Sequence, residues 1–330
     1  MNSFGKIFRI SLFGESHGKM IGVTIDGCPA GLDLQESDFE ADLSRRRSGA
    51  RGTTPRKESD APNLVGGVLN GKTTGAPVTI LFENQNIRPA DYQNLIHHPR
   101  PGHADFTAVN KFGGYADLSG GGHFSGRLTL ALVAAGVVAK KLISPVKIAA
   151  TLMEAGGSIE IDKAILAAAE KKDSIGGIIE CRAENIPAGL GEPFFDPVES
   201  ILSHIIFAIP AIKGIEFGSG FGASKMTGSQ HNDPIISEDG KTLSNNAGGI
   251  NGGITNSNDL IFRVAVKPAS SIASPQYTYS FLTGKPEILT VEGRHDVCIA
   301  LRVPPVIEAA VAIVLADLMF LEQRIGRIWR

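Results

Sequence analysis

The sequence has little cysteine and no excess of charge of either sign. Only three of its 330 residues are cysteine, and Cys28, Cys181 and Cys298 form no CxxC pair, so neither a disulfide framework nor a cysteine zinc site is predicted. The 32 basic and 34 acidic residues give a formal net charge of −2, which does not favour a nucleic-acid-binding surface. Charges such as Lys140 and Glu308 interrupt the most apolar segments, so we expect no signal peptide or membrane span. These absences favour a protein of the reducing cytoplasm.

Glycine and proline, by contrast, are plentiful. The chain has 39 glycines and 18 prolines, with 42% hydrophobic residues, which is typical of a globular protein with many tight turns. No long-period repeat and no clear linker is present, so we expect a single domain over 1–330. The stretch 218–258 is crowded with Gly, Ser and Asn and is long for a structureless loop, which indicates a functional or mobile segment.

The apolar periodicity predicts an α+β fold without regular βαβ alternation. Strands are expected at 6–13, 21–25, 78–82, 175–182 and 261–266. Helices are expected from about 37 to 47, from about 103, and at 126–142, 162–172, 196–208 and 305–321.

A run of basic residues is the strongest electrostatic feature. Six basic side chains and no acid lie between positions 45 and 57: Arg45, Arg46, Arg47, Arg51, Arg56 and Lys57. Guanidinium groups suit phosphate and carboxylate oxygens, although a solvated basic face is the plainer interpretation.

A triple glycine leads into the helix predicted at 126–142. Its free N–H groups would attract an anion, with Arg127 in the first turn, but the spacing is not that of a Walker motif. A glycine turn that serves only close packing is the alternative.

Three histidines stand beside acids or glycines, and a lysine with two hydroxyls follows a predicted strand at 267–271. His17, His103 and His295 could exchange protons near neutral pH, or each could be a structural histidine. Together with Asp105 and Asp296 they would also suit a two-metal phosphohydrolase. A non-catalytic flavin- or phosphate-binding module is a third possibility.

Ten motifs in order make the chain resemble the chorismate synthases. They are FGESHG (13–18), DLSRRRSG (42–49), RPGHAD (100–105), GGGHFSGRLT (120–129), DSIGG (173–177), PAGLGEPFFD (187–196), GSQHND (228–233), NNAGGINGGI (245–254), KPASSI (267–272) and GRHDVC (293–298). The resemblance implies a carbon-oxygen lyase that forms chorismate by 1,4 elimination of phosphate from 5-enolpyruvylshikimate 3-phosphate. It also implies a β-α-β sandwich, a cytoplasmic homotetramer, no metal, and a need for reduced FMN, with NADPH as a candidate reductant.

The resemblance also assigns roles to residues of this sequence. His17 would protonate the leaving phosphate, His103 would lie near the flavin ring, and Asp296 would take part in removing the ring proton. The residues that would bind the substrate are Arg45, Arg46, Arg51, Arg127 and Arg294. The residues that would bind FMN are His123, Phe124, Ser125, Ala211, Gly252, Lys267, Pro268, Ala269, Ser270, Ser271 and Arg294.

The chain departs from the common family pattern at four positions, one of which is Pro210, where an asparagine is common. Ser119, His123 and Leu128 stand where many members carry charged residues, and the sequence does not say which residues replace those anion contacts. It also leaves open whether the protein reduces its own flavin, and whether residues 45–57 or 218–258 close over the ligands.

Overall fold

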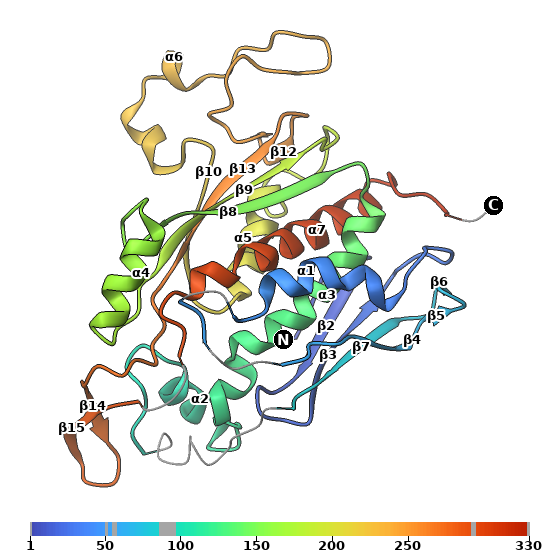
Figure 1. The fold of residues 1–330 in the computed structure, drawn as a ribbon. Coiled ribbons are helices and arrows are strands. Elements are labelled where there is room, and N and C mark those ends of the chain that lie inside the picture. The colour runs from blue at the N-terminus through green and yellow to red at the C-terminus, as the bar shows by residue number, and fades with distance from the viewer. Residues whose placement is uncertain (1, 50–51, 55–57, 86–96, 292–294, 329–330) are drawn as a thin grey trace.

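Two antiparallel sheets enclose a layer of helices in a computed structural model, which describes residues 2–49, 52–54, 58–85, 97–291 and 295–328 (Figure 1). The first sheet has the order β1 (Ser3–Phe4), β2 (Arg9–Gly14), β3 (Met20–Asp26), β7 (Val78–Glu83) and β4 (Asn63–Gly66). The second has the order β10 (Ile212–Phe217), β13 (Leu260–Val266), β9 (Gly177–Glu184) and β8 (Lys147–Ala155). In β13 alternate residues are buried, as period-2 patterning predicts for a strand with one face on a core.

The helical layer consists of α1 (Glu40–Arg46), α3 (Thr129–Leu142), α5 (Val198–Ala208) and α7 (Pro304–Leu321). α3 packs on β3 and β7, α7 packs on β8 and β9, and the two helices pack on each other. Gly136 permits this close approach, since a Cβ there would lie 2.3 Å from the Cβ of Ala309. α7 has the length and mean hydropathy of a membrane span, but 83% of it is buried inside the molecule, where it forms the centre of the core.

The remaining elements are short and mostly peripheral. They are β5 (Val68–Leu69), β6 (Lys72–Thr73), α2 (Asp105–Phe112), α4 (Ile161–Glu170), α6 (Gly228–His231), β11 (Ile250–Asn251), β12 (Ile254–Thr255), β14 (Gln276–Ser280) and β15 (Lys285–Leu289), with single turns η1 (Glu36–Phe39), η3 (Ser119–Phe124), η4 (Gly126–Leu128), η5 (Gly220–Lys225) and η6 (Ile299–Arg302).

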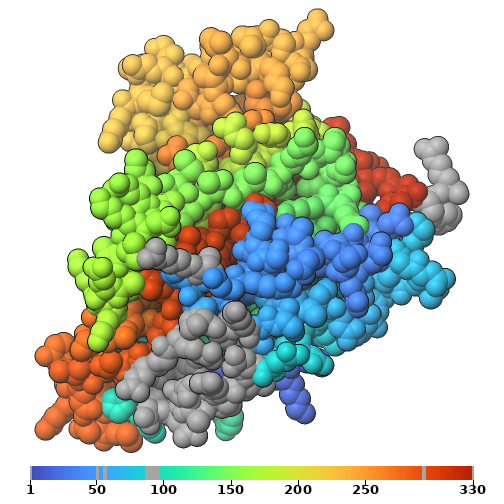
Figure 2. Space-filling view, viewed as in Figure 1, coloured from blue at the N-terminus to red at the C-terminus, as the bar shows by residue number. Residues whose placement is uncertain are grey.

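The mixture of helices and strands confirms the α+β prediction, and each element expected from the periodicity is present within a few residues. β8 and β10 are strands that the sequence analysis did not predict. Residues 218–258 are not structureless, because the Asp233 carboxylate accepts hydrogen bonds from Ser244 Oγ and from the N–H groups of Asn246 and Ala247. Figure 2 shows most of this segment, in gold, projecting from the rest of the molecule.

Candidate functional site

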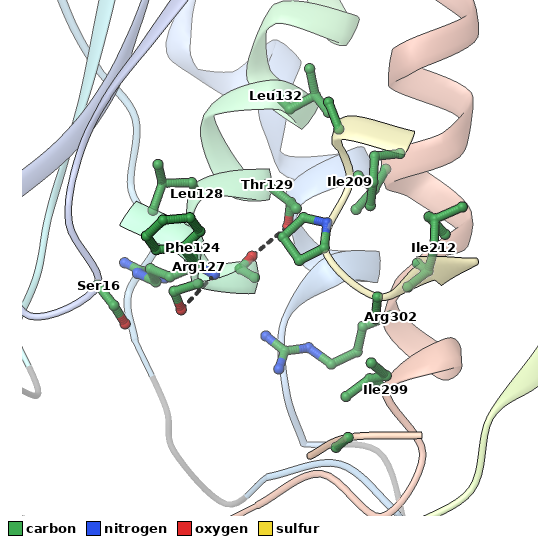
Figure 3. Close-up of a pocket in the computed structure, with 18 of the residues that line it drawn as sticks. Ser16, Phe124, Arg127, Leu128, Thr129, Leu132, Ile209, Ile212, Ile299 and Arg302 are labelled. Atoms are coloured by element: carbon green, nitrogen blue, oxygen red, sulfur yellow. Dashed lines mark hydrogen bonds between the residues drawn. The ribbon is translucent and has the colours of Figure 1, made fainter. Parts of the chain in front are cut away.

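A cavity of about 1090 Å³ opens where the helical layer meets the ends of both sheets. The N-terminal turn of α3, the connection from α5 to β10, the loop after β13 and the turn before α7 all contribute to its wall. Figure 3 shows Arg127 and Arg302 approaching this space from different elements, with the apolar side chains of Leu132, Ile209 and Ile212 beside them. Every residue of 218–258 is described, and none of them lines the cavity.

Two buried arginines are the main cationic groups of the cavity. Arg46 donates from Nε to Thr129 Oγ1 (2.9 Å), and Arg127 donates from Nε to Asn84 Oδ1 (3.0 Å). Arg127 Nη1 also binds Asp60, whose second oxygen lies 3.6 Å from Arg46 Nη1. Among the described residues neither Arg46 Nη1 nor Arg127 Nη2 has a hydrogen-bond partner, although both atoms are buried.

The electrostatics of this cluster favour an anion. Burial first, and the neighbouring charge of Arg302 second, lower the pKa of Arg46 to about 9. One carboxylate, that of Asp60, lies between the two buried guanidinium groups. Buried donors without partners cost free energy, so a ligand that supplies oxygen atoms and negative charge would be stabilised here.

Arg302 was missed by the sequence analysis and lines the same cavity. Its Nε donates to the Arg46 carbonyl (2.9 Å), and its Nη1 lies 3.4 Å from both carboxylate oxygens of Asp296. The Thr54 N–H donates to Asp296 Oδ1 (2.8 Å). The Asp296 carboxylate is therefore fixed at the cavity wall beside a cation. The sequence signal that could have identified Arg302 is that it is a lone charge in an otherwise apolar segment.

The triple glycine brings His17 and His103 to one turn. Gly120 and Gly121 adopt positive φ angles of 59° and 88°, which favour glycine. A Cβ on Gly120 would lie 2.5 Å from His17 Nε2, and a Cβ on Gly121 would lie 3.4 Å from His103 Nε2. The His17 ring therefore occupies space that a Cβ at position 120 would need, whereas the His103 ring lies at van der Waals distance from a Cβ at position 121. His17 does not itself line the cavity, but the adjacent Ser16 and Gly120 do.

His103 is oriented by an acid within its own motif. Its Nδ1 lies 2.6 Å from Asp105 Oδ1, and Arg100 donates from Nε and Nη2 to the same carboxylate (2.8 Å each). Burial opposes ionisation of Asp105, but hydrogen bonds from Arg100 and His103 hold its pKa well below the ordinary value. The ionised carboxylate accepts a hydrogen bond from Nδ1–H, so the other ring nitrogen of His103, Nε2, faces Gly121. Burial, with Arg100 nearby, lowers the pKa of His295, which also lines the cavity.

The loop after β13 packs on the RPGHAD turn. Lys267 Nζ donates to Ser270 Oγ (2.7 Å) and to the Gly102 carbonyl (3.1 Å), and Arg100 donates to Ser271 Oγ (3.0 Å). Burial, followed by the charge of nearby Lys213, lowers the pKa of Lys267.

Most of the predicted flavin-binding residues line the cavity together, namely His123, Phe124, Ser125, Ala211, Lys267, Pro268, Ala269, Ser270 and Ser271. The side chain of His123 is already engaged, since Nδ1 lies 2.9 Å from the Gly14 carbonyl and Nε2 lies 3.1 Å from Asn2 Oδ1.

Other predicted residues lie elsewhere. Arg45 turns away from the cavity and forms a two-pronged ion pair with Glu308, with both N···O distances 2.7 Å. The reason is helical geometry, since neighbouring residues of α1 point about 100° apart. Gly252 lies in the turn between β11 and β12 and is not one of the described residues that line the cavity. Arg51 and Arg294 lie outside the described residues.

The two-metal alternative finds no geometric support in the described part of the chain. No group of three or more His, Cys, Asp and Glu side chains there is close enough to hold a metal ion. Asp105, one of the expected ligands, is paired with Arg100 instead.

Comparisons with known proteins decide between the remaining interpretations. The family model described as chorismate synthase matches residues 8–320. The chain belongs to the chorismate synthase family. It is 58% identical to the chorismate synthase of Chitinophaga pinensis over the full length of both, and 45% identical to one from Dehalococcoides mccartyi over 96% of each. A crystal structure of a chorismate synthase has a TM-score of 0.75 at 27% identity and covers 98% of this chain and 94% of that one. This match confirms the expected sandwich.

Chorismate synthases are carbon-oxygen lyases that carry out the last step of the shikimate pathway, so family membership replaces both the phosphohydrolase and the binding-module interpretations.

Proposed function

We propose that the cavity binds 5-enolpyruvylshikimate 3-phosphate and reduced FMN together, and that phosphate and a ring proton are eliminated there to give chorismate. The observation that carries the proposal is the pair of buried guanidinium N–H groups, on Arg46 and Arg127, that have no hydrogen-bond partner among the described residues. The substrate brings a phosphate and two carboxylates, and FMN brings a second phosphate, so this pair of ligands supplies the missing acceptors.

The residues present fit reduced FMN. The cavity, at about 1090 Å³, is slightly larger than the roughly 300–1,000 Å³ usual for a ligand site, as expected for two ligands side by side. Leu132, Ile209 and Ile212 offer an apolar wall for a ring system, while Lys267 and Ser271 offer polar groups. When bound, reduced FMN supplies electron density to the allylic system as phosphate leaves.

The side chains of this chain then have separate tasks. Arg46 and Arg127 hold anionic groups of the substrate, with Arg302 adding positive charge. His17 donates the proton that the departing phosphate takes up. His103, fixed by Asp105, presents Nε2 to the flavin ring, and Asp296 helps to accept the ring proton. Arg45 is left out, since Glu308 holds it, whereas Arg51 and Arg294 stay candidates from the resemblance alone.

We further propose a cytoplasmic homotetramer in which the whole chain is one domain. One hydrophobic core cluster includes residues of both sheets, which supports the single domain. NADPH remains a candidate reductant.

The test is anaerobic turnover of 5-enolpyruvylshikimate 3-phosphate with chemically reduced FMN, following chorismate and released phosphate together. Equal yields of both products, obtained only with reduced flavin, are expected. A parallel reaction with oxidised FMN and NADPH asks whether the protein reduces its own flavin. Phosphate released without chorismate would contradict the proposal.

Variants test the roles of the individual residues. His17→Ala and Asp296→Ala should each lower turnover at least about tenfold with little change in FMN affinity. His98→Ala is the matched control, because His98 contacts Glu287 and does not line the cavity. Wild-type turnover in both site variants would refute the assigned roles.

A further inference from the structure

Asn84, the residue after β7, joins two parts of the site without lining the cavity. The side chain is buried, with 7% of its surface exposed. Its Nδ2 donates to the carbonyls of Glu15 (3.1 Å) and Gly18 (2.8 Å), and its Oδ1 accepts from Arg127 Nε (3.0 Å). The amide group therefore uses both hydrogens and one oxygen lone pair in three different contacts.

One side of the Asn84 amide holds the turn that carries His17. Residues 15–18 form a tight turn closed by the Gly18 N–H, which donates to the Glu15 carbonyl at 3.1 Å. Asn84 Nδ2 binds both ends of this turn, and the Asn84 N–H donates to the Lys19 carbonyl at 3.1 Å. This turn connects β2 to β3, and Asn84 follows β7, which is the neighbour of β3 in the sheet. Asn84 therefore fixes the path of the turn from the adjacent strand.

The other side of the amide holds Arg127. With Nε bound to Asn84 and Nη1 bound to Asp60, the planar guanidinium group has one orientation, and Nη2 is the atom left without a partner. Only an amide satisfies both sides. A carboxylate could accept from Arg127 but would face two carbonyl oxygens. An apolar side chain would remove a hydrogen bond from each of the three partners, and among the described contacts the Glu15 carbonyl alone would keep another, from the Gly18 N–H.

We propose that Asn84 is a positioning residue that fixes the proton donor His17 relative to the anion-binding Arg127. The inference rests on the roles proposed for those two residues. Since a misplacement of about 1 Å can cost about 10²-fold in rate, loss of the amide should slow turnover although Asn84 touches no ligand.

Kinetic coupling distinguishes positioning from a general loss of structure. Asn84→Ala is measured in the wild-type and in the His17→Ala background, with kcat and KM determined with reduced FMN. Acting through His17, the substitution lowers kcat at least about tenfold in the wild type but less than about twofold when His17 is absent. A damaged fold would lower kcat by the same factor in both backgrounds, and that result would overturn the inference.

A second variant separates the two sides of the amide and covers the case in which Asn84→Ala does not fold. Asn84→Asp keeps an acceptor for Arg127 but loses both donors to the turn, so kcat should fall while KM for the substrate stays within about threefold. A rise in KM with unchanged kcat would contradict the inference.

Asn258→Ala is the matched control. Asn258 is equally buried, at 8% exposed, and is also rich in hydrogen bonds, but it lies away from the cavity. The Asn258→Ala variant should be less stable than the wild type but should have the same kcat. If His17→Ala itself keeps full turnover, the proposed acid role fails and this inference fails with it, whereas equal factors in the two backgrounds overturn the inference alone.

Discussion

The adjacent arginines Arg45 and Arg46 should give opposite phenotypes when each is replaced by alanine. Arg45 binds Glu308 through both terminal nitrogens. Arg46 is 3% exposed, lines the cavity and has a buried N–H without a hydrogen-bond partner among the described residues. Arg45→Ala should therefore lower stability and preserve turnover, while Arg46→Ala should lower turnover.

The expected loss of unfolding free energy in Arg45→Ala depends on which hydrogen-bond partners Glu308 retains. A hydrogen bond to a charged group contributes about 1.5–3 kcal/mol, and removing one partner of a buried ion pair costs about 3–5 kcal/mol. Glu308 retains Lys140 Nζ and the Ala150 N–H, both at 3.0 Å, and Arg45 is 46% exposed and hence partly screened by solvent. We expect a loss of about 2 kcal/mol, which at the usual unfolding entropy per residue lowers Tm by about 3 °C.

Thermal denaturation and steady-state kinetics on the same preparations check both variants. Arg45→Ala should keep kcat/KM within about threefold of wild type. Arg46→Ala should lower kcat/KM about 10- to 100-fold, the equivalent of about 1.4–2.8 kcal/mol. Arg9→Ala is the control, because its pair with Asp26 is exposed and should shift Tm less. A fall in kcat/KM for Arg45→Ala at unchanged Tm would refute the assignment.

Three further substitutions test the turn against His17 and two buried carboxylates of the core. Gly120→Ala should lower kcat about tenfold or more, because its Cβ would clash with His17. Gly114→Ala, at a positive φ of 84° but with open space around the added Cβ, should lower stability alone, and kcat measured for both variants checks the prediction. Although burial opposes its ionisation, ion pairs lower the pKa of Glu308 below the ordinary 4.5, so its contribution is present above that pH and lost below it. The Tm deficit of Glu308→Gln should accordingly be largest near neutral pH and shrink as pH falls below 4.5. Asp317→Asn should lower Tm without lowering kcat, since the carboxylate accepts three backbone N–H groups from residues 6–8 and an amide has one acceptor oxygen.

Regular periodicity made most of the fold predictable, and its absence explains why β8 and β10, the two unpredicted strands of the second sheet, were missed. β13 alternates buried and partly buried residues without a break, and α7 is apolar apart from Glu308 and Asp317, so both elements are visible in the sequence. β8 reads KIAATLMEA, with three alanines and a register shift, and β10 contains Gly214 at its own irregularity. Such strands are stabilised by their neighbours in the sheet more than by local propensity.

The candidate site was predictable where a short motif contains both a functional side chain and its hydrogen-bond partners. It was not predictable where a residue far away in the sequence determines the direction of a side chain. The motifs around His103 and Lys267 supply both the groups and their partners, since Arg100 and Asp105 stand in the same six residues as His103. By contrast, the direction of Arg45 is set by Glu308, which is 263 positions away in the sequence. Local sequence could not separate Arg45 from Arg46, because either could have faced the cavity.

The triple glycine has a meaning that neither of the two sequence interpretations contained. An anion-binding turn or a close-packing turn would use glycine for backbone N–H access or for tight approach of the chain. In the structure the His17 ring fills the space next to Gly120, the His103 ring lies at van der Waals distance from Gly121, and a Cβ on Gly122 would clash with the Asp117 carbonyl. The glycines therefore place two histidines from separate motifs against one turn, next to the start of α3, where Arg127 lies. In the proposed mechanism this packing places the proton donor His17 against the turn that leads to the anion-binding Arg127.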